Sequence, residues 1–493
     1  MQAVRAGIGL ILILAAVFAA PAAATPELPL STQGRWIVDA GGRVVIVHGQ
    51  NRVAKTPPYA PDADGFAEDD AAFLAAEGDT MVRLGVIWTA VEPRPGVYDD
   101  AYLDRIEGTV RMLARHGILS LLDFHQDMVN EKFEGQGFPD WAVFPTRGLP
   151  NPKLGFPTNY LLNPALDLQY DRLLANAKGP GGVGIQDRYA DAWRHVAARF
   201  KDVPGVAGYD LINEPWPGSA WPTCIAPSGC SKPDRQLHAF QARVAARIRT
   251  VDTQSPIWFE PFSTFNAYAT TRMPALPDAN AVFSFHTYCP IEGLTLTSSP
   301  LCVPSDQTVL RRAEAYAKRS GSSLVLTEFG ATDDVKTLER VVSLADKAMV
   351  GWQHWAFTGG DPTTQASGDT QAVVIDDHAP PTDANVKTRK LDVLSRPYPR
   401  LVAGTPTGWS WDRRSGVFSS SWTTTLPSGA AAGSAESEVA LPARQFPAGY
   451  AVSVTGGAVR SAPGADVLRV VADPDADAVR VRVTRTPPSA VAP

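Results

Sequence analysis

The chain has 493 residues, 44% of them apolar and 19% charged, which is typical of a globular protein large enough for two hydrophobic cores. The formal net charge is −6. Because no basic block interrupts this acidic balance, the composition argues against a nucleic-acid partner.

The N-terminus has the features of a secretory signal peptide. Arg5 precedes an apolar run over residues 8–20, and small residues follow as far as Ala24. The run is too short for a comfortable membrane span. We therefore expect residues 1–24 to be removed by cleavage near Ala24, and the mature protein to be secreted into the extracellular medium.

Eight short runs of strand-forming residues recur through the first 390 residues. Amphipathic segments with helical spacing, such as residues 102–115 and 236–251, lie between most of them. The predicted strands are residues 44–48, 81–86, 118–124, 206–212, 257–260, 282–286, 324–328 and 350–355. Alternating strands and helices imply a parallel sheet, and eight such units predict an α/β fold, a closed (β/α)8 TIM barrel over residues 25–395.

One interval between predicted strands is far longer than a single helix requires. Its residues 127–184 are rich in Gly, Pro, Asn and aromatic side chains. Long loops in compact domains are commonly functional. We therefore expect a substrate-binding loop at the rim of the barrel.

The pattern changes after the last predicted barrel strand. Residues 359–389 are polar and loop-like, and short alternating strands without helices begin at about residue 404. These strands are predicted at residues 416–424, 436–441, 450–455, 467–472 and 478–484. They indicate a small C-terminal β-sandwich over residues 396–487, followed by a disordered tail at residues 488–493.

The four cysteines are Cys224, Cys230, Cys289 and Cys302. In an exported protein such residues indicate disulfides. Proximity along the chain favours the pairs Cys224–Cys230 and Cys289–Cys302, each of which would close one loop. A zinc site is the alternative, although the spacings fit no usual zinc pattern.

Two predicted strands end on a glutamate that a turn signal follows. Residues 211–215 read Leu-Ile-Asn-Glu-Pro and residues 326–330 read Leu-Thr-Glu-Phe-Gly. A parallel barrel places its chemistry at the C-terminal ends of its strands, and paired carboxyls there suit the cleavage of a glycosidic bond. The sequence therefore predicts Glu214 and Glu328 as catalytic residues, with rim salt bridges as the competing interpretation.

Other residues at strand ends face the same predicted pocket. Asn213 can donate its amide to a sugar hydroxyl, and Arg83 would keep a neighbouring glutamate ionised unless it forms a purely structural ion pair. We interpret His125 and His286 as hydrogen-bond partners of substrate. The ligand spacing of a metal site is missing and the reaction requires none, so we expect neither a metal nor a cofactor.

These motifs resemble glycoside hydrolase family 5. Four segments resemble its endoglycoceramidase branch, and the likeness extends over about residues 30–490. These segments are residues 91–98, 123–127 (Asp-Phe-His-Gln-Asp), 209–215 and 396–400 (Arg-Pro-Tyr-Pro-Arg). The resemblance implies a retaining enzyme that cuts the β-bond between sugar and ceramide and releases the whole oligosaccharide of a glycosphingolipid.

The same resemblance implies the roles of single residues. Glu214 matches the acid/base and Glu328 the nucleophile. The residues that match contacts to the sugar are Lys55, Asp127, His125, Asn213, Tyr288 and Trp355. Residues 130–133 and 140–142 look closer to branch members that prefer a galactosyl–ceramide link. The chain departs from the branch at residues 286–289, where Cys289 puts the substrate contacts of this loop in doubt.

A glycolipid has an apolar half, so the pocket should continue into an apolar groove. Six aromatic residues on rim loops either line it or pack the long loop onto the barrel. They are Phe133, Phe138, Trp141, Phe144, Trp216 and Trp221. We expect a monomer that touches a membrane or micelle peripherally. The competing functions are a β-glucanase or mannanase, and a catalytically silent glycolipid-binding protein.

Overall fold

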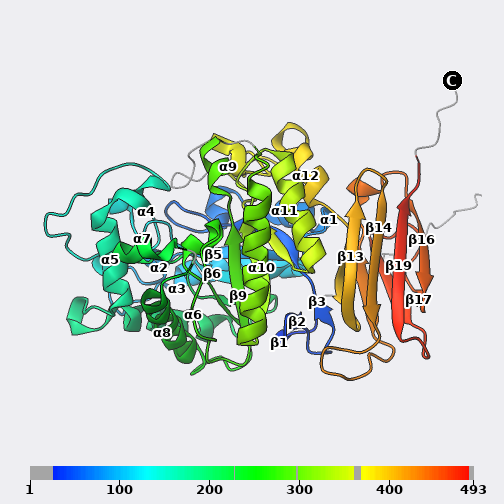
Figure 1. Cartoon of the computed structure of the whole chain (residues 1–493), viewed down its shortest axis with the longest axis horizontal. Coiled ribbons are helices and arrows are strands. Elements are labelled where there is room, and N and C mark those ends of the chain that lie inside the picture. The colour runs from blue at the N-terminus through cyan, green and yellow to red at the C-terminus, as the bar shows by residue number, and fades with distance from the viewer. Residues whose placement is uncertain (1–25, 227, 296–297, 360–367, 488–493) are drawn as a thin grey trace, which may run out of the picture.

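A computed structural model of the chain describes residues 26–226, 228–295, 298–359 and 368–487 (Figure 1). The predicted signal peptide and the predicted C-terminal tail lie outside these residues. Within the described part of the chain, no helix is both long enough and apolar enough to cross a membrane.

Eight parallel strands close into a barrel, in which the last strand pairs with the first. They are β4 (His48–Arg52), β5 (Met81–Val86), β6 (Leu119–Phe124), β7 (Val206–Asp210), β8 (Ile257–Phe259), β9 (Ala281–Thr287), β10 (Ser323–Phe329) and β11 (Trp352–His354). Every residue of β5, β6, β9 and β10 is buried, as expected for parallel strands that are covered on both sides. The barrel predicted from the sequence is confirmed.

The sequence pattern predicts the first barrel strand at residues 44–48, and this prediction is wrong. The strand is β4, which begins at His48 and reads His-Gly-Gln-Asn-Arg. The apolar residues Val44 and Val45 form β3 and pair with β12 (Tyr398–Val402) outside the barrel. Apolar runs mark burial in any sheet, whereas the polar side chains of β4 are buried with polar partners: Gln50 contacts His354, and Asn51 donates to the carbonyl of Thr327.

Amphipathic helices cover the outside of the barrel (Figure 1). The long ones are α3 (Asp100–Arg115), α6 (Ile185–Phe200), α8 (Ser231–Ile248), α10 (Cys302–Ser320) and α11 (Val335–Ala348). Shorter helices are α1 (Glu68–Ala76), α2 (Trp88–Val91), α7 (Trp221–Cys224), α9 (Pro290–Thr295) and α12 (Thr388–Leu394). Aspartates cap two of the long helices, because Asp99 and Asp334 accept hydrogen bonds from backbone amides of the first turn.

The long interval between β6 and β7 is an ordered excursion at the left of Figure 1. It contains α4 (Thr158–Leu162) and α5 (Pro164–Leu174), besides short 3-10 turns. Asn163 accepts a hydrogen bond from the amide of Leu166, and Pro164 occupies the first turn of α5. Both features are favourable helix starts.

The C-terminal domain of antiparallel strands is confirmed and lies at the right of Figure 1. One sheet has the order β1-β2-β3-β12-β15-β18-β17 and the other the order β13-β14-β19-β16. The remaining bounds are β1 (Ser31–Gln33), β2 (Trp36–Val38), β3 (Val44–Val45), β13 (Thr405–Asp412), β14 (Val417–Thr423), β15 (Glu436–Ala440), β16 (Tyr450–Thr455), β17 (Gly457–Val459), β18 (Val467–Ala472) and β19 (Ala478–Arg485). Strands β1–β3, which the sequence analysis placed in the barrel unit, thus complete this domain.

Buried polar contacts join the C-terminal domain to the barrel. Trp409 donates to Asp346 of α11 across 3.0 Å, and Arg396 pairs with the same carboxylate at 2.8 Å. The ring of His48 stacks between Trp352 and Tyr398, with centroid distances of 4.1 and 3.6 Å. The domain also packs against the end of the barrel at which the strands begin, because Ile37, Val45 and Leu401 share an apolar cluster with Met81 and Leu119.

Candidate active site

Arg83 is fully buried and is the third of the six residues of β5, so the prediction that it stands at the end of this strand is wrong. The carboxylates that its guanidinium contacts are Asp123 (3.1 Å), Asp210 (2.9 Å), Glu260 (2.8 Å) and Glu328 (2.6 Å). Burial alone would lower the pKa of Arg83, but these carboxylates outweigh it and raise the pKa well above its ordinary value. Arg83 is therefore both a structural ion-pair centre and a direct partner of a predicted catalytic residue.

The two predicted catalytic glutamates meet in one cleft. One carboxylate oxygen of Glu214, one of Glu328 and a ring nitrogen of His286 all lie within 4.8 Å of one another. Glu214 follows β7 with a left-handed φ of 42°, which is uncommon for a residue other than glycine. Its amide donates to Glu260 across 2.8 Å, so a neighbouring strand end holds this turn in place.

Both oxygens of Glu328 accept hydrogen bonds. Arg83 donates to Oε1 at 2.6 Å, and the hydroxyl of Tyr288 donates to Oε2 at 3.0 Å. Burial raises the pKa of Glu328, and the positive charges of His286 and Arg83 oppose that shift. Donors on both oxygens favour the ionised form of this carboxyl.

Among the described residues, hydrogen-bond donors reach one oxygen of Glu214. Its Oε1 lies 2.5 Å from the amide nitrogen of Asn266 and 2.8 Å from Nδ1 of His286. Burial acts to lower the pKa of His286, but Glu260 and Glu328 outweigh it and raise the pKa well above its ordinary value. The imidazole is therefore a cation that donates to Glu214.

The trio of Glu214, His286 and Glu328 is also compact enough to hold a metal ion. A metal-ligating histidine must be neutral, with a nitrogen free for the ion. Here His286 is protonated and lies between two glutamates. Its Nδ1 contacts Glu214, and its Nε2 lies 3.4 Å from Oε1 of Glu260. These contacts fit a proton-transfer pair better than a metal centre, and the expected absence of a metal stays a prediction.

The residues predicted to contact the sugar form a second group at the same end of the barrel. Nζ of Lys55 lies 2.5 Å from Asp127 and 4.5 Å from the ring centroid of Trp355. The ring of His125 is parallel to that of Trp355, with centroids 5.2 Å apart. Burial opposes protonation of His125, but Asp123 and Asp127 raise its pKa to about 9.

Asn213 and Asp123 connect the two groups. Asn213 accepts from Arg83 at 3.1 Å and donates to the carbonyl of Gln126 at 3.0 Å. Asp123 contacts Arg83 through one oxygen and His125 through the other. All ten predicted catalytic and sugar-contacting residues thus lie in one continuous network, while their individual roles stay predictions.

Glu260 is the main residue that the sequence analysis missed. It directly follows β8, contacts Arg83 through Oε1 and accepts from the amide of Glu214 through Oε2. Burial raises its pKa to about 7. The signal was available, because the fifth predicted strand ends on this glutamate and Pro261 follows it, as Pro215 follows Glu214. Asn266, also missed, lies in a short 3-10 turn that no motif marks.

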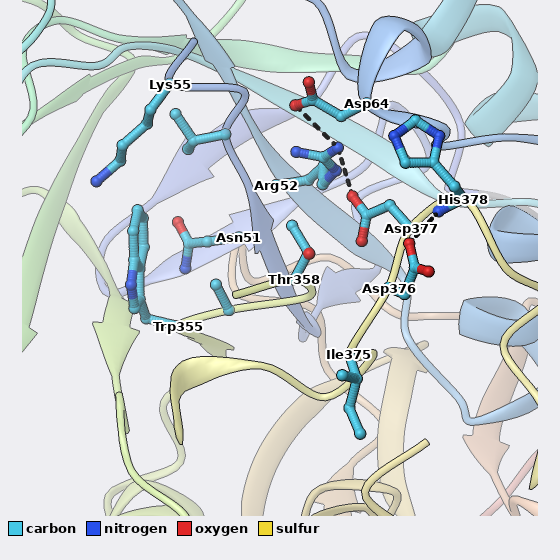
Figure 2. Close-up of a pocket in the computed structure, with 12 residues that line it drawn as sticks. Asn51, Arg52, Lys55, Asp64, Trp355, Thr358, Ile375, Asp376, Asp377 and His378 are labelled. Atoms are coloured by element: carbon cyan, nitrogen blue, oxygen red, sulfur yellow. Dashed lines mark hydrogen bonds and ion pairs between the residues drawn. The ribbon is translucent and has the colours of Figure 1, made fainter. Parts of the chain in front are cut away.

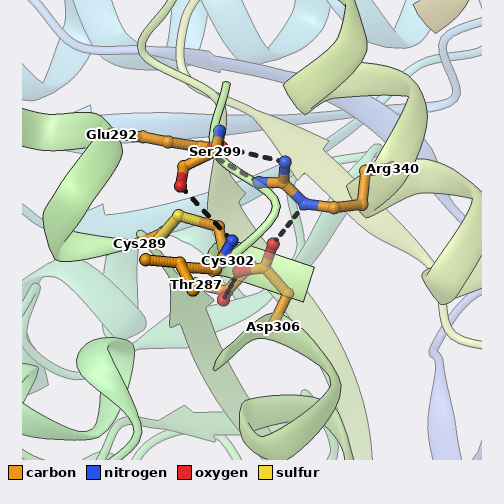
Figure 3. Close-up of a disulfide and its surroundings, with 8 residues drawn as sticks. Thr287, Cys289, Glu292, Ser299, Cys302, Asp306 and Arg340 are labelled. Carbon is orange, nitrogen blue, oxygen red and sulfur yellow. Dashed lines mark hydrogen bonds and ion pairs between the residues drawn. A yellow bond between two sulfur atoms is a disulfide. The ribbon is translucent and has the colours of Figure 1, made fainter. Parts of the chain in front are cut away.

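Both predicted disulfides are confirmed, Cys224–Cys230 and Cys289–Cys302. The second begins at the residue after Tyr288, and it ties the loop that follows β9 to the first residue of α10 (Figure 3).

An ion-pair relay supports the same loop (Figure 3). Thr287 donates to Asp306 of α10 at 3.0 Å, and Asp306 pairs with Arg340 of α11 at 2.8 Å. Arg340 also pairs with Glu292 of α9 at 2.7 Å. Covalent and ionic contacts therefore fix the backbone on both sides of Tyr288.

The six rim aromatics pack against the core of the barrel to different extents. Phe133, Phe138 and Trp216 are buried, and the other three are half-buried against the same core. Trp88 makes edge contacts with Phe138 and Trp141, at centroid distances of 5.0 and 5.3 Å.

Comparisons with known proteins match the chain to glycoside hydrolases. Residues 38–361 match the family model described as cellulase (glycosyl hydrolase family 5), and residues 396–484 match the glycoside hydrolase family 5 C-terminal domain. Endoglycoceramidase I of Rhodococcus hoagii is 34% identical over 476 residues, which cover 94% of this chain and 89% of that protein.

Solved structures extend the similarity to the whole architecture. Endo-glycoceramidase II from Rhodococcus sp. is 29% identical with a TM-score of 0.74, over 91% of this chain and 99% of that one. Its structures include a lactosyl-enzyme intermediate and a ganglioside GM3 complex. An endogalactoceramidase structure is 25% identical with a TM-score of 0.73, over 94% of this chain and all of that one.

Proposed function

The chain belongs to glycosyl hydrolase family 5 and is a glycoside hydrolase, and on that premise we propose that it releases the oligosaccharide of glycosphingolipids by a retaining mechanism. The bond cut is the β-bond between the first sugar and ceramide. Support for the substrate comes from the similarity to endoglycoceramidases over nearly the whole chain.

The observation that carries the retaining mechanism is the distance between the two glutamates. Retaining glycosidases place their carboxyl groups about 5–5.5 Å apart, whereas inverting enzymes leave about 6.5–9.5 Å for a water molecule. One oxygen of Glu214 and one of Glu328 lie within 4.8 Å of each other. This spacing favours direct attack by a carboxylate on the anomeric carbon.

In the first step, the carboxylate of Glu328 attacks the anomeric carbon and the bond to the ceramide oxygen breaks. Glu214 gives its proton to that oxygen, so ceramide leaves as an alcohol and the sugar remains as an ester of Glu328. Both donors on Glu214 contact Oε1. The transferred proton is therefore assigned to Oε2.

In the second step, Glu214 is ionised and takes a proton from a water molecule. The water oxygen attacks the anomeric carbon, and the ester bond to Glu328 breaks. Arg83 and Tyr288 already donate to the two oxygens of Glu328, so they stabilise the carboxylate as it is released. Two inversions at the same carbon give net retention.

The lipid half of the substrate has a candidate contact surface on the rim loops. Six exposed apolar residues lie on segments that follow β6, β7 and β9, at the catalytic end of the barrel. They are Leu149, Leu154, Leu161, Leu162, Ile225 and Leu301. The most exposed, Leu162 and Leu301, are 59% and 67% accessible. Exposed apolar residues on loops at the same end of the barrel favour contact with a membrane or micelle, which we propose for these loops.

We also propose that the protein is exported. The basic and apolar start of the chain supports a signal peptide. The two disulfides support an oxidising compartment.

The test is incubation with a glycosphingolipid whose ceramide carries a fluorescent acyl chain. We expect intact oligosaccharide and free fluorescent ceramide as products. NMR spectra recorded early in the reaction should show the released oligosaccharide as its β-anomer. Parallel reactions with glucosyl- and galactosyl-linked ceramide determine which linkage is cut.

Two other outcomes contradict the proposal. Cleavage of β-glucan or mannan without cleavage of glycolipid indicates a polysaccharide hydrolase. Retention of glycolipid on the protein with no cleavage of either substrate indicates a silent binding protein.

A further inference from the structure

A cavity of about 240 Å³ opens at the catalytic end of the barrel beside Trp355 (Figure 2). Its walls come from the end of β4 with the loop that follows it, and from two segments that follow β11. Figure 2 shows Lys55 and Trp355 on one side of this cavity and a cluster of charged residues on the other.

The cavity adjoins the nucleophile. Asn51, which lines it, accepts from Arg83 at 3.2 Å and donates to the carbonyl of Thr327 at 2.9 Å. Thr327 directly precedes Glu328. A glycan with its first sugar at Glu328 can therefore extend past Trp355 and place a further sugar in the cavity.

The far side of the cavity has an excess of negative charge. Arg52 is buried and pairs with Asp377 at 2.6 Å and with Asp64 at 3.4 Å. Asp376 lies beside them and is exposed. The charge of Lys55, on the near side, is matched by Asp127. At the far side, Arg52 and His378 thus face three aspartates, which leaves an excess of negative charge when the histidine is neutral.

We propose that Asp64 and Asp376 select a neutral second sugar over an anionic one in this cavity. This inference rests on the proposed function. Aspartates accept hydrogen bonds from the paired hydroxyls of a neutral sugar. A sugar carboxylate offers acceptors only and carries the same sign of charge, so it is disfavoured in the cavity.

The experiment compares two synthetic glycolipids that differ in one group. Both carry the same ceramide and first sugar, and the second sugar is either galactose or the galacturonic acid made by oxidising its C6. We expect a kcat/KM roughly tenfold higher for the neutral compound. Addition of 0.5 M NaCl should reduce this difference in kcat/KM between the two compounds, because salt screens charges near the surface.

The variants D376N and D64N/D376N should bring the kcat/KM values of the neutral and anionic glycolipids closer together than they are in the wild type. The single variant provides the test if the double variant does not fold. The matched control is D475N, which removes one exposed aspartate from the turn between β18 and β19 and should leave the ratio unchanged.

Three results would overturn the inference. If the wild-type enzyme cleaves the two glycolipids at equal rates, the inference is wrong and the proposed function is unaffected. If folded D376N and D64N/D376N discriminate between the neutral and anionic glycolipids as strongly as the wild type, other residues cause the preference for the neutral sugar. If the enzyme cleaves neither glycolipid, the result contradicts the proposed function as well.

Discussion

Tyr288 donates its hydroxyl hydrogen to Oε2 of Glu328 across 3.0 Å, and the next residue along the chain is the disulfide cysteine Cys289. Burial raises the pKa of Tyr288 well above its ordinary value, so its hydroxyl remains a donor throughout the neutral range. The disulfide therefore fixes the loop that supplies one of the two donors to the proposed nucleophile.

Removal of this disulfide should lower turnover more than substrate affinity. In the double variant C289S/C302S we expect kcat to fall roughly tenfold, because a looser Tyr288 loses its hydrogen bond to Glu328. KM should change less. The free energy of unfolding should fall by about 3 kcal/mol, as for other loops of this length. Steady-state kinetics and urea unfolding measure both effects.

The other disulfide is the matched control for that prediction. In C224S/C230S the loop that is opened is shorter, so the loss of stability should be about 2 kcal/mol, and kcat should stay close to that of the wild type. Equal losses of kcat in the two variants would mean that Cys289–Cys302 acts through general stability and not through Tyr288.

Substitution of Tyr288 by phenylalanine should move the acid limb of the pH profile. The variant loses a hydrogen bond to the ionised carboxyl, so the pKa of Glu328, already raised by burial, rises further. The nucleophile must be ionised, so activity is lost as pH falls through that pKa. We expect the acid limb of kcat/KM to shift upward by about one pH unit. A profile that is uniformly lower, with no shift, would contradict this role of Tyr288.

The approach of Glu214 and Glu328 to one another could be predicted from sequence because each glutamate stands at or shortly after the end of a readable strand. Turn chemistry after the strand marks both positions: Pro215 follows Glu214 directly, and Gly330 follows shortly after Glu328. Gly330 has a φ of 105°, and a side chain there would lie 2.6 Å from the ring of His354, so this position requires glycine.

What the sequence could not reveal depends on three-dimensional contacts between strands. Arg83 forms ion pairs with carboxylates from β6, β7 and β10 and from the residue that follows β8. The spacing of these residues along the chain does not indicate that they contact the same side chain. The first barrel strand was misplaced because its own side chains are polar. Asn266 was missed because it lies in an irregular turn.

Replacement of the two glutamates should separate their roles. We expect E328Q and E214Q each to lower turnover by roughly three orders of magnitude or more with little effect on the fold. In E328A, azide should occupy the place of the lost nucleophile and give an α-glycosyl azide. In E214A with an activated aryl glycoside, azide should attack the glycosyl-enzyme and give a β-glycosyl azide. The same azide anomer from both variants would contradict the assignment.

His125 should make the stability of the protein depend on pH above neutrality. Its Nδ1 lies 2.7 Å from Asp123, and its pKa is raised from an ordinary 6.5 to about 9. The charged imidazole therefore stabilises the fold fully below pH 6.5, and this contribution is lost as pH rises through about 9. The loss across that window should be on the order of 3 kcal/mol.

The measurement is the free energy of unfolding in urea at several pH values between 7.5 and 9.5, a range that lies above the titration of Glu260 near pH 7. In the wild type this free energy should decrease with pH. In H125Q it should be lower than in the wild type at pH 7.5 and almost flat, so that the two proteins differ less at pH 9.5. Glutamine has no proton to lose, and Asp123 keeps only Arg83 as a cationic partner. A slope in H125Q as steep as in the wild type would show that another group causes the dependence.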